Sequence, residues 1–157
     1  MDRDARILIV DDDENIRKVL TTILEDEGYI VESAKTAKKA IEKTRKKIYN
    51  LALIDIRLPD MEGIKLLTKM KDTMPKMRKI IITGYPTLQN AVEAVNRGAD
   101  AYIIKPFNIK EVLNTIREEI IKQQEEKEYS QEKVADFIET RVKQLEKEGE
   151  LTHKRDH

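Results

Sequence analysis

Short apolar runs alternate with longer amphipathic stretches along most of this chain. Five runs are three or four residues long and apolar at every position: residues 7–10, 29–31, 51–54, 80–82 and 101–104. Runs of this length, rich in Ile and Val, are typical of strands that a sheet buries on both faces. We therefore predict five strands, of which the second is the weakest.

The segments between these runs predict helices, because apolar residues recur three and four positions apart and so line one helix face. Residue types that favour helix ends bound several of these segments. The expected N-caps are Thr36, Thr87 and Asn108, and the expected stops are Gly28, Gly98 and the Met74-Pro75 pair. The third helix is expected to carry Ile64, Leu66, Leu67 and Met70, and the fourth to turn Leu88, Ala91, Val92 and Val95 inward.

Alternation of strands and helices predicts an α/β fold of the (βα)5 type, a flavodoxin-like, doubly wound parallel sheet with strand order 2-1-3-4-5. This domain is expected to span residues 1–123. The fifth helix is predicted to end near residue 122, and residues 124–130 to form a linker or kink.

A further amphipathic helix is predicted over residues 131–148, followed by a disordered tail over 149–157. Ser130 suits its N-cap, and its apolar stripe is Val134, Phe137, Ile138, Val142 and Leu145. A helix with so few apolar residues is marginal alone in water. It is expected to dock on the preceding domain, to pair with another copy, or to bind a partner.

Composition narrows the class of function. Thirty Lys+Arg balance thirty Asp+Glu among 157 residues, and such neutrality disfavours DNA binding. The basic residues at 35–47 are accordingly interpreted as a solvated helix face. There is no Cys, which excludes thiolate metal sites and a Cys nucleophile. No apolar run is long enough to span a membrane and no signal peptide is expected, so the predicted location is the cytoplasm.

Candidate chemistry lies where the predicted strands end. Asp11-Asp12-Asp13 follow the first strand, Asp55 the third, Thr83-Gly84 the fourth and Lys105-Pro106 the fifth. These ends meet at one edge of a parallel sheet. Clustered carboxylates favour Mg²⁺, a lysine suits a phosphoryl group, and a carboxylate can act as a nucleophile. The residues therefore predict Mg²⁺-dependent phosphoryl transfer onto Asp55, on the central strand.

Four motifs carry a family resemblance: 9–13 (IVDDD), 54–63 (IDIRLPDMEG), 82–84 (ITG) and 105–107 (KPF). Together they resemble the response-regulator receiver domains of two-component signalling, and most closely those of the nitrogen-regulator type. The resemblance covers about residues 5–123.

This resemblance implies a role for each matching residue. Asp55 is implied as the phosphoacceptor, and Asp11 and Asp12 as the acidic pair that holds Mg²⁺, with Asp12 the more direct ligand. Arg57 is implied to supply a backbone carbonyl to the metal, and Lys105 to bind the phosphoryl group. Asp13 is interpreted as a helix cap rather than a third ligand.

Other matching residues are implied in switching. Thr83 resembles the switch hydroxyl and Tyr102 the switch aromatic. Gly84 leaves little cover over the phosphoryl group, and Pro106 resembles a proline preceded by a cis bond. Arg57 and Tyr85 either shield the site from water or are ordinary rim residues.

The function expected is that of a single-domain response regulator, a phosphoacceptor and not an enzyme with other substrates. A sensor histidine kinase or phosphotransfer protein is the expected donor, and a downstream protein the expected target. A homodimer is expected through the fourth helix, fifth strand and fifth helix, or through the C-terminal helix. The alternatives are a phosphorylation-independent interaction scaffold or, less favoured because Arg57 stands where a second Asp is needed, an aspartyl-phosphate-type phosphatase.

Overall fold

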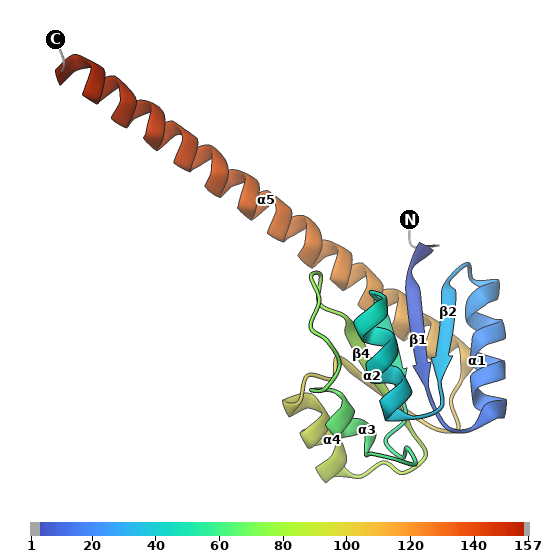
Figure 1. Ribbon diagram of the computed structural model, residues 1–157. Helices are drawn as coiled ribbons and strands as arrows, with labels where there is room; N and C mark the ends of the chain where they lie inside the picture. Colours follow the sequence, from blue (N-terminus) through green and yellow to red (C-terminus); the bar gives the residue numbers. More distant parts are fainter. Residues whose placement is uncertain (1–3, 156–157) are drawn as a thin grey trace. The chain divides into compact units, whose positions relative to one another are not determined.

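Five parallel strands form the sheet of this computed structural model, which describes residues 4–155 (Figure 1). The strands are β1 (Arg6–Val10), β2 (Ile30–Ala34), β3 (Leu51–Ile54), β4 (Arg78–Thr83) and β5 (Ala101–Ile104). The helices are α1 (Glu14–Asp26), α2 (Ala37–Lys46), α3 (Gly63–Leu66), α4 (Leu88–Asn96) and α5 (Ile109–Arg155). The strand order β2-β1-β3-β4-β5 confirms the predicted fold.

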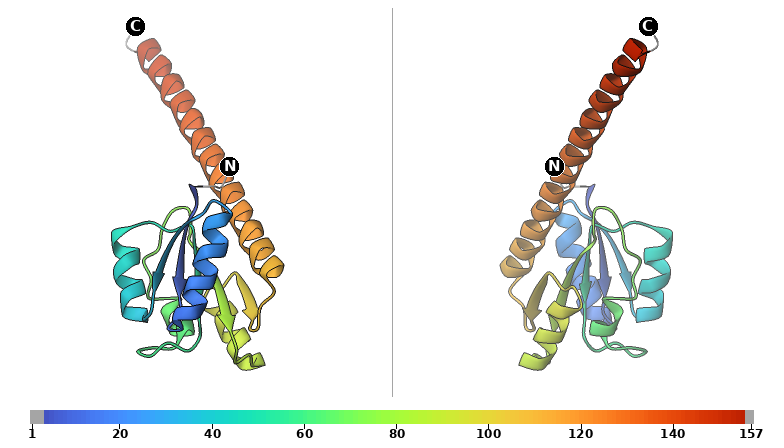
Figure 2. Two further views of the ribbon diagram at one scale, coloured as in Figure 1. Left: turned by 90° about the vertical axis from the view of Figure 1, so that its right-hand side faces the viewer. Right: turned by 90° about the vertical axis from the view of Figure 1, so that its left-hand side faces the viewer.

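Helices cover both faces of the sheet because its strands alternate their side chains between two cores. Leu8 and Val10 of β1 pack in one core with α2, α3 and α4. Ile7 and Ile9 pack in the other with α1 and the first part of α5. Figures 1 and 2 show these layers from three sides. Burial on both faces holds for β1, β3 and β4.

The edge strands differ from the prediction of full burial. Ile30 of β2 is 40% exposed and Ile104 of β5 is 51% exposed. Both strands have a neighbour on one side only, so helices cover them less completely. The apolar run by itself does not distinguish an edge strand from a central one.

Three of the predicted N-caps are confirmed. Thr36 and Thr87 accept hydrogen bonds from the backbone N–H groups three residues on, at 3.1 and 3.0 Å. Asn108 accepts from the N–H of Lys110 at 2.8 Å. These residues compete locally for the free N–H groups of a first helical turn, which is why sequence alone located them.

α4 leaves exposed the three large apolar side chains that were predicted to face inward. Leu88, Val92 and Val95 are 84%, 52% and 67% exposed, whereas Ala94 is fully buried. Ala94, which was not among the predicted inner residues, packs in the core with α2 and α3, while Ala91, which was, is half-buried. The prediction was wrong because it took the larger apolar side chains of the helix for its inner face.

α3 is shorter than predicted. The α-helix spans only Gly63–Leu66; Leu67 and Lys69 bond back three residues, and the last helical bond runs from the N–H of Met70 to the carbonyl of Leu66 at 3.3 Å. Nζ of the buried Lys79, on β4, donates to the carbonyl of Leu67. That carbonyl would accept the next bond of a continuing helix, so a residue twelve positions away helps to end it.

α5 runs without a break from Ile109 to Arg155, so residues 124–130 form no non-helical linker and no helix starts at Ser130. This stretch is polar but consists mainly of Gln, Glu and Lys, which favour helix, and it lacks Gly and Pro. The predicted disordered tail is helical as far as Arg155, and residues 156–157 lie outside the described residues. The chain nevertheless divides into two compact units, Met1–Gln123 and Gln124–His157.

A polar network occupies the edge of the sheet where the strands begin. The buried side chain of Gln123 donates to the carbonyls of Asn50 and Lys76, both at 2.8 Å, and accepts from Asn50 Nδ2 at 3.1 Å. Asn50 Oδ1 accepts from the N–H of Arg6 at 2.9 Å. The network joins the starts of β1, β3 and β4 to α5.

Ion pairs extend this edge beside β4. Arg78 contacts Asp100 at 3.2 Å and the buried Glu119 of α5 at 3.7 Å. Asp100 also accepts from the N–H of Lys79 at 2.9 Å. Buried polar groups here are matched by partners of opposite charge or hydrogen-bonding capacity.

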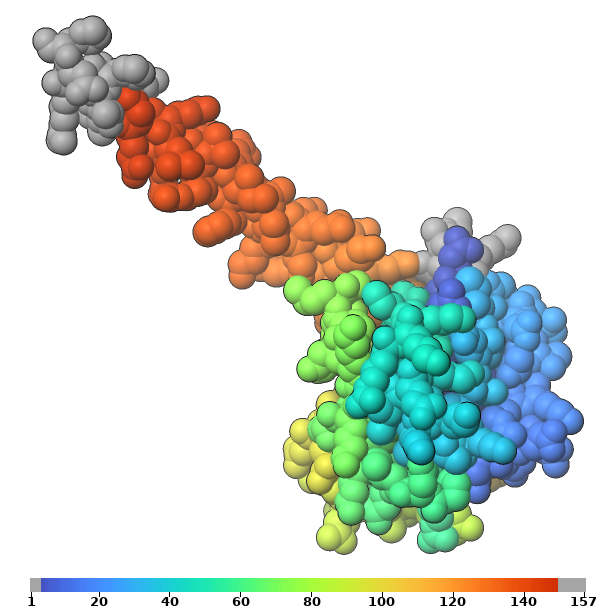
Figure 3. All heavy atoms as spheres, viewed as in Figure 1, coloured from blue at the N-terminus to red at the C-terminus, as the bar shows by residue number. Residues whose placement is uncertain are grey.

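The basic residues around α2 lie on the surface, where Figure 3 shows this helix in cyan. Six of them are exposed: Lys35, Lys38, Lys39, Arg45, Lys46 and Lys47. Lys47 forms an ion pair with Glu32 at 3.4 Å. Among the described helices, none is long and apolar enough to cross a lipid bilayer.

Candidate functional site

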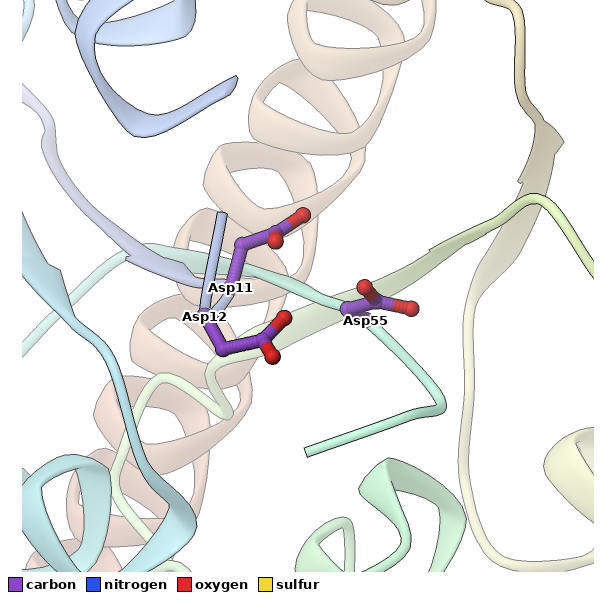
Figure 4. A group of neighbouring side chains, drawn as sticks. All are labelled: Asp11, Asp12 and Asp55. Atoms are coloured by element: carbon purple, nitrogen blue, oxygen red, sulfur yellow. The ribbon is translucent and has the colours of Figure 1, made fainter. Parts of the chain in front are cut away.

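Three carboxylates converge where β1 and β3 end. Asp11 and Asp12 follow β1, and Asp55 follows its hydrogen-bonded neighbour β3. One oxygen from each carboxylate lies within 4.8 Å of the others. Figure 4 draws the three side chains. Asp11 and Asp55 are buried and Asp12 is exposed. The cluster is therefore anchored in the fold and reachable from solvent on the Asp12 side.

Asp13 is not part of this cluster. Its carboxylate accepts from the N–H groups of Asn15 at 2.9 Å and Ile16 at 3.3 Å and caps α1. Its own N–H donates to Asp11 Oδ1 at 2.9 Å. The interpretation of Asp13 as a cap is confirmed, and its backbone helps to orient Asp11.

Lys105 lies across the cluster. Its Nζ donates to Asp11 Oδ2 at 2.8 Å and to Asp55 Oδ2 at 3.2 Å. The Lys105–Pro106 bond is cis, as the resemblance implies, and the Met74–Pro75 bond is cis as well. Burial opposes the charge on Lys105, but its bonds to the two carboxylates outweigh this and raise its pKa. The ammonium therefore stays charged at neutral pH.

The surroundings of Asp55 disfavour its ionised carboxylate and raise its pKa. Burial is the main cause that raises its pKa, and the charge of Asp11 adds to it. Lys105 and the N–H of Arg57, which donates to Asp55 Oδ1 at 3.2 Å, lower the pKa but do not cancel the rise. Three acids face one ammonium, so a further cation would stabilise the ionised cluster.

The donor set of this cluster fits a hard divalent cation. Carboxylate oxygens are the ligands that Mg²⁺ and Ca²⁺ prefer, and the exposed Asp12 leaves room for waters or phosphate oxygens. Cys and His contribute nothing to the cluster, so its chemistry does not favour softer metals.

The residues implied in switching lie on β4 and β5. Thr83 is fully buried, and its Oγ1 accepts from the N–H of Tyr85 at 3.0 Å. The backbone N–H of Lys105 donates to the carbonyl of Thr83 at 2.7 Å, so the two candidate residues are directly joined. Tyr102 is partly buried and packs against the core that holds α2, α3 and α4.

Gly84 is exposed beside Thr83. A Cβ added at Gly84 would meet only Lys105 Cβ, at 3.8 Å, which is ordinary van der Waals contact. The position is therefore open, in keeping with little steric cover over the site.

Arg57 and Tyr85 stack on each other. The guanidinium carbon of Arg57 lies 3.5 Å from the ring centroid of Tyr85, and both residues are exposed. The pair links the loops that follow β3 and β4 and borders the site. Sequence analysis placed both residues near the rim but had no signal for their contact, because it forms between separate loops.

Two residues that support the site have no role in the sequence analysis. A Cβ at Gly63 would lie 2.0 Å from the carbonyl oxygen of Asp55, so only glycine fits beneath the acceptor strand end. The Asp60 carboxylate accepts from the N–H groups of Ala37 and Lys38, both at 2.9 Å, and so ties the loop after β3 to the start of α2. Both lie in the 54–63 motif, which was the available signal.

Comparison with known proteins agrees with this architecture. Residues 7–117 match the model of the response regulator receiver domain. A putative NtrX-like response regulator of Rickettsia bellii is 39% identical over 104 residues, which are 65% of this chain and 22% of that protein. The chain spans about a quarter of the length of the curated relatives that it matches.

Solved structures show the same relationship. The receiver domain protein of Methanospirillum hungatei is 50% identical, with a TM-score of 0.75 over 78% of this chain and 98% of that one. The beryllofluoride-activated NtrC4 receiver domain dimer is 34% identical, with a TM-score of 0.71 over 75% and 98% of the two chains. The resemblance to nitrogen-regulator-type receivers is confirmed, and the chain belongs to the response regulator receiver family of two-component systems.

Proposed function

We propose that Asp55 accepts a phosphoryl group from a phosphohistidine of a sensor kinase or phosphotransfer protein. The observation that carries this proposal is the cluster of three carboxylates within 4.8 Å, bridged by Lys105. The P–N bond to histidine breaks, a P–O bond to Asp55 forms, and the released imidazole nitrogen takes up a proton. The product is an acyl phosphate on a protein that acts on no other substrate.

Asp11, Asp12, Asp55 and the backbone carbonyl of Arg57 would hold Mg²⁺ in this reaction. The ion supplies positive charge to the phosphoryl oxygens and to the crowded carboxylates. Lys105 donates to a phosphoryl oxygen from the opposite side, where its ammonium already contacts Asp55. Because the ammonium also contacts Asp11, it must give up part of this contact to reach the phosphoryl group.

Phosphorylation then changes a protein-binding surface. Thr83 turns its hydroxyl toward the new oxygens and Tyr102 moves into the space that this opens, which shifts α4 and β5. The surface they share already exposes apolar side chains at Leu88, Val92 and Ile104. A downstream protein, or a second copy of the receiver unit, is the expected partner of this surface.

Labelling with a small phosphodonor tests the assignment. The chain with Mg²⁺ and phosphoramidate is expected to gain a hydroxylamine-sensitive phosphoryl group, and Asp55→Asn to lose it. Asp26→Asn is a matched control, since this exposed carboxyl at the end of α1 lies outside the carboxylate cluster, and it should be labelled like wild type. Labelling of Asp55→Asn would refute the acceptor, no labelling of wild type would favour a phosphorylation-independent scaffold, and turnover of a phosphomonoester would favour a phosphatase.

A further inference from the structure

The C-terminal part of α5 carries an apolar stripe that the chain leaves in solvent. Val134, Phe137, Ile138, Val142 and Leu145 are between 47% and 71% exposed. Large apolar side chains gathered over three helical turns are unusual on a surface without a partner. The stripe therefore indicates a binding face, and its sequence indicates what binds there.

The stripe fits a heptad repeat. Ala135 and Val142 occupy a positions, and Ile138 and Leu145 occupy d positions, seven residues apart in each case. A β-branched residue at a followed by Leu at d is typical of two-stranded parallel coiled coils. Of the other two residues of the stripe, Val134 falls at a g position beside the seam and Phe137 at a c position outside it.

Charges beside the seam differ between its two sides. The e positions are all glutamates: Glu132, Glu139 and Glu146. The g positions within the seam are Val134, Arg141 and Glu148, and Lys127 is the g position that precedes it. Within the described part of this chain, Arg141 donates to Gln144, and neither Arg141 nor Glu146 forms an ion pair.

Chain direction decides whether these charges attract or repel. In a parallel pair, each g residue faces the e residue five positions later on the other chain, so Arg141 meets Glu146 and the apolar Val134 meets Glu139. In an antiparallel pair, e faces e, so the glutamates at 132, 139 and 146 oppose one another. The charges are thus complementary to a second copy of the same helix in parallel.

We infer that residues 132–148 of α5 form a parallel two-stranded coiled coil with a second copy of this chain. The seam is short, because the preceding a and d positions are the polar Gln124, Glu128 and Gln131. The dimer is therefore reversible and depends on concentration. Its formation does not require phosphorylation of Asp55, so it stands or falls apart from the proposed function.

Cysteine cross-linking of the full chain tests both pairing and direction, because the chain has no cysteine of its own. Under mild oxidation with diamide, Ile138→Cys and Leu145→Cys are each expected to form a same-residue disulfide, since d positions lie side by side in a parallel pair. Lys143→Cys, on the outer face, is the matched control and should stay reduced. The Asp55→Asn background should give the same pattern.

Several outcomes would overturn the inference. An antiparallel pair would cross-link at no more than one of residues 138 and 145. A stripe bound to this chain's own surface or to an unrelated protein would leave both variants reduced. Equal cross-linking at Lys143→Cys would mean random collision.

Sedimentation equilibrium of the full chain tests the charge pairing. Arg141→Glu should weaken the dimer about threefold to tenfold, as expected for exposed ion pairs that occur twice. Arg141→Glu combined with Glu146→Arg should restore it, while Lys143→Glu should have little effect. A wild-type chain that stays monomeric, or an Arg141→Glu variant that the second change does not rescue, would refute the parallel arrangement.

Discussion

The two ends of the sheet both gather polar side chains, but they differ in how these are satisfied. At the end where strands begin, Gln123 and Asn50 exchange hydrogen bonds with each other and with nearby carbonyls. At the end where strands finish, Asp11 and Asp55 share the ammonium of Lys105, and Asp12 adds a third carboxylate to their cluster. The first set is saturated, and the second holds a surplus of negative charge.

This difference separates a structural network from a candidate site. A polar cluster whose members satisfy one another has little to offer a ligand, and its loss costs stability. A cluster of like charges that the fold holds together is stabilised by an added cation, so the loss of one of its carboxylates weakens cation binding. Variants at the two ends should therefore separate stability from Mg²⁺ affinity.

The largest effect is expected at Gly63. Gly63→Ala forces a Cβ to within 2.0 Å of the Asp55 carbonyl oxygen, so the strand end that carries the acceptor must move. The free energy of unfolding should fall by about 3 kcal/mol, as for severe overpacking. Chemical denaturation measures this change.

Gly149→Ala is the matched control for Gly63→Ala. A Cβ at Gly149 meets nothing within 4 Å, and alanine favours helix. This variant should unfold no more easily than wild type. Equal stability of Gly63→Ala and wild type would contradict the close approach to Asp55.

Gln123→Leu should break the saturated end of the sheet. It leaves the Asn50 amide and the Lys76 carbonyl without their partner, although the Asn50 carbonyl keeps the N–H of Arg78, and the free energy of unfolding should fall by about 2 kcal/mol. Mg²⁺ affinity, measured by titration calorimetry, should not change. As a control, Gln89→Leu on the exposed face of α4 should leave the free energy of unfolding nearly unaltered. A loss of Mg²⁺ binding in Gln123→Leu would contradict the separation of the stability network from the Mg²⁺ site.

At the other end of the sheet, Asp12→Asn should weaken Mg²⁺ binding without lowering stability. Removal of one of three crowded carboxylates relieves repulsion, so stability should hold or rise slightly. Mg²⁺ affinity should fall at least about tenfold, since even outer-shell losses have that effect. Asp13→Asn keeps the capping oxygen and should bind Mg²⁺ like wild type; an equal loss in both variants would make Asp13 a ligand after all.

The smallest effect is expected at Asp60 and depends on pH. The N–H groups of Lys38 and Ala37 lower the pKa of this carboxyl, so it stabilises the fold above its unfolded pKa and loses that contribution as pH falls through the lowered value. Asp60→Ala should cost about 1 kcal/mol at pH 7, as for a lost helix cap. Denaturation at pH 7 and pH 3 should show the gap between wild type and variant narrowing in acid, and a constant gap would exclude the ionised cap.

Local patterns predicted much of this protein. Continuous apolar runs located the strands, and Thr36, Thr87, Asn108 and Asp13 located helix starts, because a cap acts within three residues of itself. The order of the motifs also placed Asp11, Asp12 and Asp55 at one sheet edge, since strand ends in such a fold must meet there.

Tertiary structure decided what depends on distant residues. Lys105 meets Asp11 across 94 positions and Gln123 meets Asn50 across 73, separations at which no periodicity specifies a contact. The outward face of α4 and the early end of α3 likewise follow from packing against β4 and its neighbours. Sequence determined which groups reach the site, because strand ends are set locally; only the packed fold determined which of them neutralise one another, because that depends on distances between side chains far apart in the chain.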